Sequence, residues 1–444
     1  MKKLKVAMLG AGSGFVLGIA KELMEYELFD NCEFVIMDIA EDRLKVAKDT
    51  VSEILKKGKT SIKLTATTSM EKALDGANHV ITSCEQNRYA NWVKDLRIPA
   101  KHGVHQIKGE NGGPGGMIHA IRNIALFEDI LSGINKYCPD AWLMNLTNPM
   151  SVLCTYFKNY SKIKALGFCH QVHGSFGVIS EMLGMNPGDI QVLAGGINHL
   201  SWLFDIRKRN SGKSCMDEFL QKVRCSKYWT KNFKMIPEQK FTLEMLNIFN
   251  MYPIGYDDHI IEYLSCFWEE HEWKDNGYKS LDGSYEKLAN QKSYSLENQH
   301  LLGKEYEKPP FPKDPNHQHY VEKPCQMIMA LETNTPTYID GINIVNNGAI
   351  SNLPSDAILD LPAVAIAGEV RSIHVGELPL GPMEICRRQV TLHEMIAKAA
   401  HDGDDSLAIQ TLCLDPYVRS ITQAKNIWDD FREEYANSLP KSFQ

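Results

Sequence analysis

A thiol and several imidazoles are the side chains of this sequence best suited to chemistry. Cys169 and His170 follow the apolar run 165–168, and His199 follows a glycine-rich run thirty residues later. A thiolate and an imidazole can hold a divalent metal together, because both are common ligands of transition metals. His170 and His173 form an alternative pair of ligands. The remaining interpretation is a buried thiol beside a hydrogen-bonded histidine, with no metal.

Amide side chains lie close to these groups. Asn148 follows the apolar run 142–145, and Asn198 immediately precedes His199. Amides can hold sugar hydroxyls or a nicotinamide through hydrogen bonds. Open α/β sheets bind ligands at the carboxyl ends of their strands, so Asn148 and Cys169 are predicted to lie in such a crevice.

A glycine-rich loop is the second feature with a chemical meaning. It follows the first apolar run and comprises Gly10, Ala11, Gly12, Ser13, Gly14 and Phe15. Phe15 stands where the dinucleotide fingerprint G-x-G-x-x-G has its third glycine, so the loop alone is also compatible with a tight structural turn. Asp38 ends the next apolar run, where an acid can bind the ribose hydroxyls of NAD and repel the phosphate of NADP. Loop and acid together predict NAD binding.

The elements that must position these groups alternate in the first half of the chain. Short apolar runs are typical of buried parallel strands, and they occupy residues 6–9, 34–37, 80–83, 142–145 and 165–168. Between them, residues 16–26, 40–57 and 116–136 repeat apolar side chains at helical spacing. This alternation predicts an α/β fold, with a Rossmann-type doubly wound sheet as the NAD-binding domain over residues 1–195.

The second half predicts a mixed α+β domain over residues 196–444, which would carry the substrate, metal and oligomerisation surfaces. Residues 191–206 have a strand pattern, and residues 217–223 and 241–250 have helical patterns. Residues 269–323 are polar and rich in proline, which indicates a surface excursion or flap. A segment with β-branched runs follows over 327–379, and residues 390–432 are helical in pattern.

The composition excludes several classes of protein. Of 444 residues, 43% are hydrophobic and 23% are charged, which is typical of a globular protein. The net charge is −7 without a basic cluster, which argues against nucleic acid as a partner. No apolar run reaches 18 residues and no signal peptide is recognisable, so we expect no membrane partner. Eleven scattered cysteines suit a reducing compartment, and we expect a cytoplasmic protein.

Taken together, the motifs resemble glycoside hydrolase family 4, the NAD- and divalent-metal-dependent glycosidases whose fold is akin to lactate and malate dehydrogenases. The resemblance covers nearly the whole length. It rests on the loop 10–14, Asn111-Gly112-Gly113-Pro114-Gly115-Gly116, Thr147-Asn148-Pro149-Met150, Cys169-His170, Gly196-Ile197-Asn198-His199 and Asn352-Leu353-Pro354. The combination of Cys-His with Ile-Asn-His is specific, and plain hydroxy-acid dehydrogenases lack it.

The resemblance implies a mechanism unlike that of two-carboxylate glycosidases. NAD would oxidise C3 of the sugar, which acidifies the proton at C2. A base would remove that proton, the glycosidic oxygen would leave by elimination, water would add at C1, and C3 would be reduced again. A metal, usually manganese in the family, would stabilise the charge that develops on the C2 and C3 oxygens.

The resemblance also implies residue roles. Cys169 and His199 match the metal ligands of the family, and Asn148 matches an amide that contacts the substrate. His170 stands where members acting on phosphorylated glycosides tend to carry Asp or Asn, and it can assist the leaving group as an acid. The segment 254–263 resembles the one that supplies the catalytic base. Asp257 is our first choice there.

Tyr256 is the alternative base, and without the resemblance the polar run around it would be interpreted as a solvated turn. Asn198, His119 and Arg88 are further candidates for substrate contacts. Relatives commonly have Arg at the place of His119, so specificity can differ here. Arg88 is available for a phosphate or a uronic acid carboxylate.

We therefore expect a glycosidase for unphosphorylated α-glycosides, with an α-galacturonide or an α-galactoside as substrate. An α-glucosidase and a 6-phospho-glycosidase are the alternatives within the family. A plain NAD-dependent hydroxy-acid dehydrogenase and a non-catalytic NAD-sensing protein are alternatives outside it. Members of the family are commonly dimers or tetramers, so we expect a homodimer or homotetramer.

Overall fold

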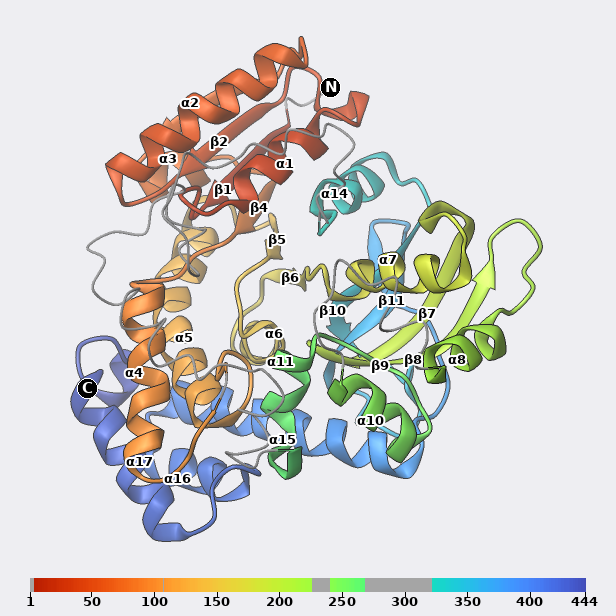
Figure 1. Cartoon of the computed structure of the whole chain (residues 1–444). Coiled ribbons are helices and arrows are strands. Elements are labelled where there is room, and N and C mark those ends of the chain that lie inside the picture. The colour runs from red at the N-terminus through yellow and green to blue at the C-terminus, as the bar shows by residue number, and fades with distance from the viewer. Residues whose placement is uncertain (1–3, 107, 226–239, 268–321) are drawn as a thin grey trace, which may run out of the picture.

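The computed structural model describes residues 4–106, 108–225, 240–267 and 322–444 (Figure 1). Six parallel strands form the sheet of the N-terminal half in the order β3-β2-β1-β4-β5-β6. They are β1 (Lys5–Leu9), β2 (Glu33–Met37), β3 (Lys63–Thr67), β4 (His79–Thr82), β5 (Trp142–Asn145) and β6 (Lys164–Gly167). The predicted doubly wound sheet is confirmed, with one strand more than the apolar runs indicate. That strand, β3, lies at the sheet edge and is partly exposed, so it has no continuous apolar run.

Helices connect these strands. They are α1 (Phe15–Leu23), α2 (Glu41–Lys57), α3 (Met70–Leu74), α4 (Arg88–Lys101), α5 (Gly113–Tyr137), α6 (Met150–Tyr160) and α7 (Gln171–Leu183). In α2 the buried residues Leu44, Ala47, Val51 and Ile54 recur every three or four positions, and acids open the helix while lysines close it. Such charges complement the helix dipole, so the apolar spacing and the charged ends of α2 both favour a helix over these residues.

The strands of the C-terminal half extend the same sheet. They are β7 (Ile190–Ile197), β8 (Leu200–Lys208), β9 (Pro253–Ile254), β10 (Thr337–Val345), β11 (Ile358–Ile366) and β12 (Glu369–Ser372). β10 pairs antiparallel with β6, with Asn343 opposite Gly167, and the sheet continues as β11, β7, β8 and β9. The predicted domain boundary at residue 195 stays a prediction. Strands from both sides of this boundary are hydrogen-bonded into one sheet.

The later helices are α8 (Met216–Arg224), α10 (Lys240–Phe249), α11 (Asp257–Ile260), α14 (Pro324–Thr333), α15 (Leu380–Asp402), α16 (Asp405–Leu414) and α17 (Ile421–Glu434). Figure 1 shows α15 to α17 gathered beside α4 and α5, and α15 packs on both α5 and α6. The helix predictions at 217–223 and 241–250 correspond to α8 and α10. The expected surface excursion at 269–323 lies almost entirely outside the described residues.

Two large apolar clusters flank the sheet, and their largest fully buried side chains include Trp202 and Trp428. All eleven cysteines lie in the described ranges, and each of them is a free thiol. Among the helices of those ranges, none combines the length and the apolar character that crossing a membrane requires.

Candidate active site at the carboxyl ends of the strands

The glycine loop between β1 and α1 packs tightly against the neighbouring strand ends. Gly10 has a φ of +80°, and a Cβ atom added there would lie 2.1 Å from the carbonyl oxygen of Ser83. The backbone N–H groups of Gly10 and Ala11 both donate to the Met37 carbonyl, at 2.9 Å. Only glycine can occupy position 10 without displacing the backbone of residue 83.

Asp38 anchors the same loop. Its buried carboxylate accepts the N–H groups of Gly12 at 2.8 Å and Ala40 at 2.9 Å, and Arg43 lies 3.9 Å away. Within the described ranges the hydroxyl oxygen of Ser13 is buried and has no hydrogen-bond partner. Phe15 begins α1 and is about one-third exposed. An acid at the second strand end and an unsatisfied hydroxyl at the start of a helix fit a dinucleotide.

Cys169 and His199 come together from two connections of the sheet. Cys169 follows β6, and His199 occupies the left-handed region, with φ +67°, in the turn between β7 and β8. Sγ of Cys169 lies 3.4 Å from Nε2 of His199, and both side chains are buried. Burial raises the pKa of the Cys169 thiol to about 12, and the carboxylate of Asp360 adds to the shift.

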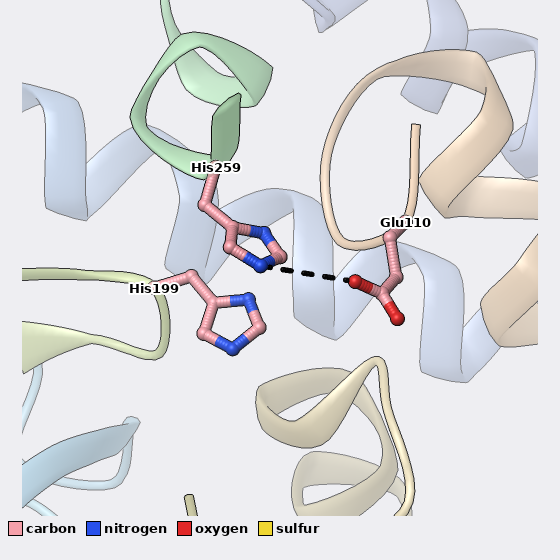
Figure 2. A group of neighbouring side chains, drawn as sticks. All are labelled: Glu110, His199 and His259. Atoms are coloured by element: carbon pink, nitrogen blue, oxygen red, sulfur yellow. Dashed lines mark ion pairs between the residues drawn. The ribbon is translucent and has the colours of Figure 1, made fainter. Parts of the chain in front are cut away.

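His199 also belongs to a second group of potential ligands. Figure 2 shows Glu110, His199 and His259 converging from the loop before α5, the β7–β8 turn and α11. One ligand atom of each lies within 4.8 Å of the others. The His199 and His259 rings are 3.7 Å apart, and His259 Nε2 lies 3.9 Å from a Glu110 carboxylate oxygen. The Asn111 amide lies 2.9 Å from His199 Nδ1, where it can donate a hydrogen bond.

His199 and Glu110 are in the protonation states that a metal requires. Burial holds the pKa of His199 well below its ordinary value, and the neighbouring His259 adds to the shift. Burial alone would raise the pKa of Glu110, but Arg88 and Lys108 outweigh it and hold the value well below the ordinary range. A neutral imidazole beside an ionised carboxylate is a competent set of donors.

Charged partners surround this group. Arg88 donates to Glu85 at 2.7 Å and to Glu110 at 2.6 Å. Lys108 donates to Asp258 at 2.6 Å and lies 2.9 Å from Nε2 of His259. The guanidinium of Arg88 is therefore held between two carboxylates.

The predicted base Asp257 has a different environment. Its carboxylate is buried and accepts the N–H groups of Phe241 at 3.1 Å and Thr242 at 3.0 Å, as well as the Thr242 hydroxyl at 2.8 Å. It therefore caps the N-terminus of α10. Tyr256, which precedes α11, is 37% exposed.

The remaining predicted residues lie around the same centre. The side-chain oxygen of Asn148 is buried without a hydrogen-bond partner among the described residues, and Asn198 is buried in the turn that carries His199. The side chain of His170 is 42% exposed, and its Nδ1 lies 3.1 Å from a carboxylate oxygen of Glu322. His119 contacts the Glu110 carbonyl at 2.8 Å and Glu85 at 3.1 Å. Burial lowers the pKa of His119, yet Glu85 more than compensates and raises it.

Sequence reasoning did not single out Glu110, His259 or Glu262. Glu110 directly precedes the glycine-rich run 111–116, and the other two lie in the segment 254–263 that was considered for the base. Their positions beside loops already suspected of function were the available signal.

Comparison with known proteins places the chain in a family. The model of the family 4 glycosyl hydrolases matches residues 5–185, and the model of their C-terminal domain matches residues 194–418. The chain belongs to glycosyl hydrolase family 4. It is similar to the alpha-galactosidase of Rhizobium meliloti (strain 1021), with 28% identity over 99% of this chain and 90% of that protein. The alpha-glucosidase of Erwinia rhapontici is 28% identical over 98% and 99% of the two chains.

Solved structures share the fold of this family 4 glycosyl hydrolase. The 6-phospho-beta glucosidase from Thermotoga maritima, solved with manganese, NAD+ and glucose-6-phosphate, superposes with a TM-score of 0.79 at 20% identity, over 98% of this chain and all of that one. The predicted family and its fold are confirmed, and the protein is a glycosidase. In the present chain the glycine loop lies in the segment 5–185 that matches the first family model. His199 and His259 lie in the segment 194–418 that matches the C-terminal model.

Proposed function

We propose that this glycosidase hydrolyses neutral, unphosphorylated α-glycosides, with α-galactosides as the preferred class. Two α-galactosidases, from Rhizobium meliloti and Bacillus subtilis, match it over nearly the full length of this chain. Curated α-galacturonidases match it as well. The relatives therefore leave the charge of the sugar open, and support for a neutral sugar has to come from the site.

The environment of Arg88 carries the argument for a neutral sugar. Its guanidinium contacts Glu85 and Glu110 at 2.7 and 2.6 Å, so its positive charge is already neutralised. The pKa of Glu85 is lowered: burial opposes ionisation, but Arg88 and His119 overcome it. A uronate or phosphate beside Arg88 would meet two carboxylates and be repelled by them. Sugar hydroxyls would instead find acceptors there.

We further propose NAD as the cofactor and a divalent metal such as Mn²⁺ as the electrophile. The residues present fit both groups: the unsatisfied Ser13 hydroxyl and Asp38 support a dinucleotide, and the lowered pKa of the buried His199 imidazole supports a metal. When bound, NAD supplies reversible oxidation at C3 of the sugar, and the metal supplies positive charge that stabilises the oxygens at C2 and C3.

His199 and Cys169 are the ligands that we propose for the metal, with Glu110 and His259 as further donors within reach of His199. Carboxylate and imidazole donors suit Mn²⁺ better than a thiolate alone does, so the second pair makes this metal chemically reasonable. The unsatisfied amide oxygen of Asn148 and the buried amide of Asn198 would receive sugar hydroxyls.

Two residues of this chain would move protons. His170 is partly exposed and is oriented by Glu322, which suits an acid that protonates the leaving oxygen. For removal of the C2 proton we propose Tyr256 ahead of Asp257. Both oxygens of Asp257 accept hydrogen bonds from the start of α10, whereas Tyr256 is partly open to solvent.

The experiment is hydrolysis of aryl α-galactoside, α-galacturonide, α-glucoside and 6-phospho-glucoside under reducing conditions, each with and without NAD and Mn²⁺. We expect the α-galactoside to be cleaved fastest, only with both additives, and without net NADH. Faster cleavage of the galacturonide would contradict the charge argument. Steady NADH formation without sugar release would show a dehydrogenase instead.

A further inference from the structure

The carboxylate of Glu262 joins the two segments that carry Glu110 and His259. Glu262 lies in the short turn η3 (Ile261–Tyr263), directly after α11, and only 2% of it is exposed. One of its oxygens, Oε2, accepts the backbone N–H groups of Glu110 at 2.6 Å, Asn111 at 2.6 Å and Gly112 at 3.2 Å. The other, Oε1, lies 2.7 Å from Nδ1 of His259.

The contact to His259 selects one form of that imidazole. A neutral ring has one N–H donor and one acceptor nitrogen, and a carboxylate beside Nδ1 requires the proton on Nδ1. The lone pair is then on Nε2. Lys108 lies 2.9 Å from Nε2 and can donate to it, and Nε2 faces Glu110 at 3.9 Å. This is the nitrogen that a metal next to Glu110 would need.

The contacts to the loop fix Glu110 and Asn111. Three successive N–H groups converge on one oxygen, as in the anion-binding nests formed by backbone amides. A Cβ atom at Gly112 would lie 2.5 Å from the carbonyl oxygen of Glu262, so this approach needs glycine. Asn111 in turn lies within hydrogen-bond distance of Nδ1 of His199. The Glu262 carboxylate is thus hydrogen-bonded to the Glu110 backbone and lies beside His259, and it is linked to His199 through Asn111.

We propose that Glu262 is the positioning residue of the metal site: it holds His259 with the lone pair on Nε2, facing Glu110, and keeps the Glu110 loop within reach of the same point. The inference rests on the proposed function, because it assumes that a divalent metal binds near His199. Carboxylates that orient a ligating histidine typically change metal affinity by about 10- to 100-fold when they are removed.

The test is the Mn²⁺ affinity of the Glu262→Gln variant, measured by titration calorimetry with the full chain. The amide keeps the size of the side chain and an oxygen for the loop, but it lacks the second acceptor for His259. We expect Mn²⁺ to bind about 10- to 100-fold more weakly, with NAD affinity and far-ultraviolet circular dichroism unchanged. Unchanged Mn²⁺ affinity would overturn the proposal.

Glu332→Gln is the matched control. Glu332 contacts the buried His79 at 2.7 Å, which is the same type and length of pair. His79 begins β4, at the opposite end of the strand from the site. The control should leave both the Mn²⁺ and the NAD affinity unchanged. An equal loss of Mn²⁺ affinity in both variants would mean that the effect is not positional and would overturn the proposal.

A second measurement needs no metal. Nitrogen-15 NMR of histidine-labelled, metal-free protein reports which ring nitrogen of His259 carries the proton, with the signals assigned through His259→Gln. We expect Nδ1–H in the unaltered protein, and Nε2–H there would overturn the proposal. If Nδ1–H is found but Mn²⁺ does not bind, the positioning of His259 is supported and the metal in the proposed function is refuted.

Discussion

The Sγ atom of Cys169 lies 3.4 Å from Nε2 of His199, although thirty residues separate them in the chain. Two different connections create this contact: the end of β6 carries the thiol, and the turn between β7 and β8 carries the imidazole. Burial keeps the thiol protonated, with its pKa raised to about 12. A metal that binds this pair must therefore displace a proton from sulfur.

The first prediction follows from that proton. Mn²⁺ binding between pH 7 and 9 should release about one proton, and the affinity should rise about tenfold per pH unit, because the thiol is neutral throughout this range. Cys169→Ser should abolish the pH dependence and most of the activity while NAD affinity stays the same. Calorimetry in two buffers of different ionisation enthalpy measures the proton. A pH-independent affinity in the unaltered enzyme would remove Cys169 from the ligand set and leave Glu110, His199 and His259.

The second prediction concerns the charge of the sugar. Glu85→Gln removes one of the two carboxylates that hold Arg88, so an anionic substrate should be accepted more readily. We expect the ratio of kcat/KM for α-galacturonide over α-galactoside to rise about three- to tenfold, the size of one partly screened charge interaction. Glu53→Gln, which breaks a surface pair of Glu53 with Lys57 at 2.6 Å, is the control and should not change the ratio. An unchanged ratio in Glu85→Gln would show that the sugar does not approach Arg88.

Some of this site could be predicted from the sequence. The predictable features are those whose residues lie close together in the chain. The glycine loop, Asp38 and the apolar strands are local patterns, and the structure has them where they were expected. Glu110 and His259 meet across about 150 residues, so no local pattern marks them. The edge strand β3 was missed because its partly exposed residues lack an apolar run.

Asp257 illustrates a different limit. The family resemblance made Asp257 the expected base, but the cap that it forms on α10 depends on where residues 241 and 242 fold back. A carboxylate in a polar run can serve as a base, a metal ligand or a helix cap, and only the partners in space distinguish these roles.

The third prediction concerns the choice of dinucleotide. Asp38→Asn keeps the size of the side chain but replaces one of the two oxygens that accept the Gly12 and Ala40 N–H groups. It also removes the negative charge that would repel a ribose phosphate. NAD affinity should fall about tenfold, while NADP affinity should rise, since Arg43 is then free of its carboxylate partner. Fluorescence titrations with both dinucleotides measure the ratio. Asp42→Asn, in the first turn of α2, is the control. Equal losses for NAD and NADP would contradict the role of Asp38 in discrimination.

The fourth prediction concerns stability. Glu22 is buried in α1, accepts the N–H of Gln326 at 2.9 Å at the start of α14, and has its pKa raised from 4.5 to about 7 by burial. A raised pKa means that the folded state binds the proton more tightly. Its contribution to stability is therefore complete below pH 4.5 and is lost as the pH rises to 7.

Glu22→Gln keeps the acceptor for Gln326 and carries no charge at any pH. It should increase the free energy of unfolding by about 1–3 kcal/mol at pH 8 and change it little at pH 4.5. Urea unfolding at both pH values measures the difference, and the exposed Glu27→Gln is the control. A variant less stable than the unaltered protein at pH 8 would mean that the charge of Glu22 is satisfied in the fold.

The last prediction separates the two candidate bases. Tyr256→Phe should stop the exchange of the sugar C2 proton with solvent deuterium, and it should leave stability within about 0.5 kcal/mol because the side chain is partly exposed. Asp257→Asn should do the reverse. It turns one acceptor of the α10 cap into a donor facing a backbone N–H, which costs about 1–3 kcal/mol, while exchange continues. Exchange is followed by NMR of the substrate with NAD and Mn²⁺ present, alongside urea unfolding of each variant. If Asp257→Asn stops exchange at full stability, the carboxylate is the base and its contacts to α10 serve to hold it in place.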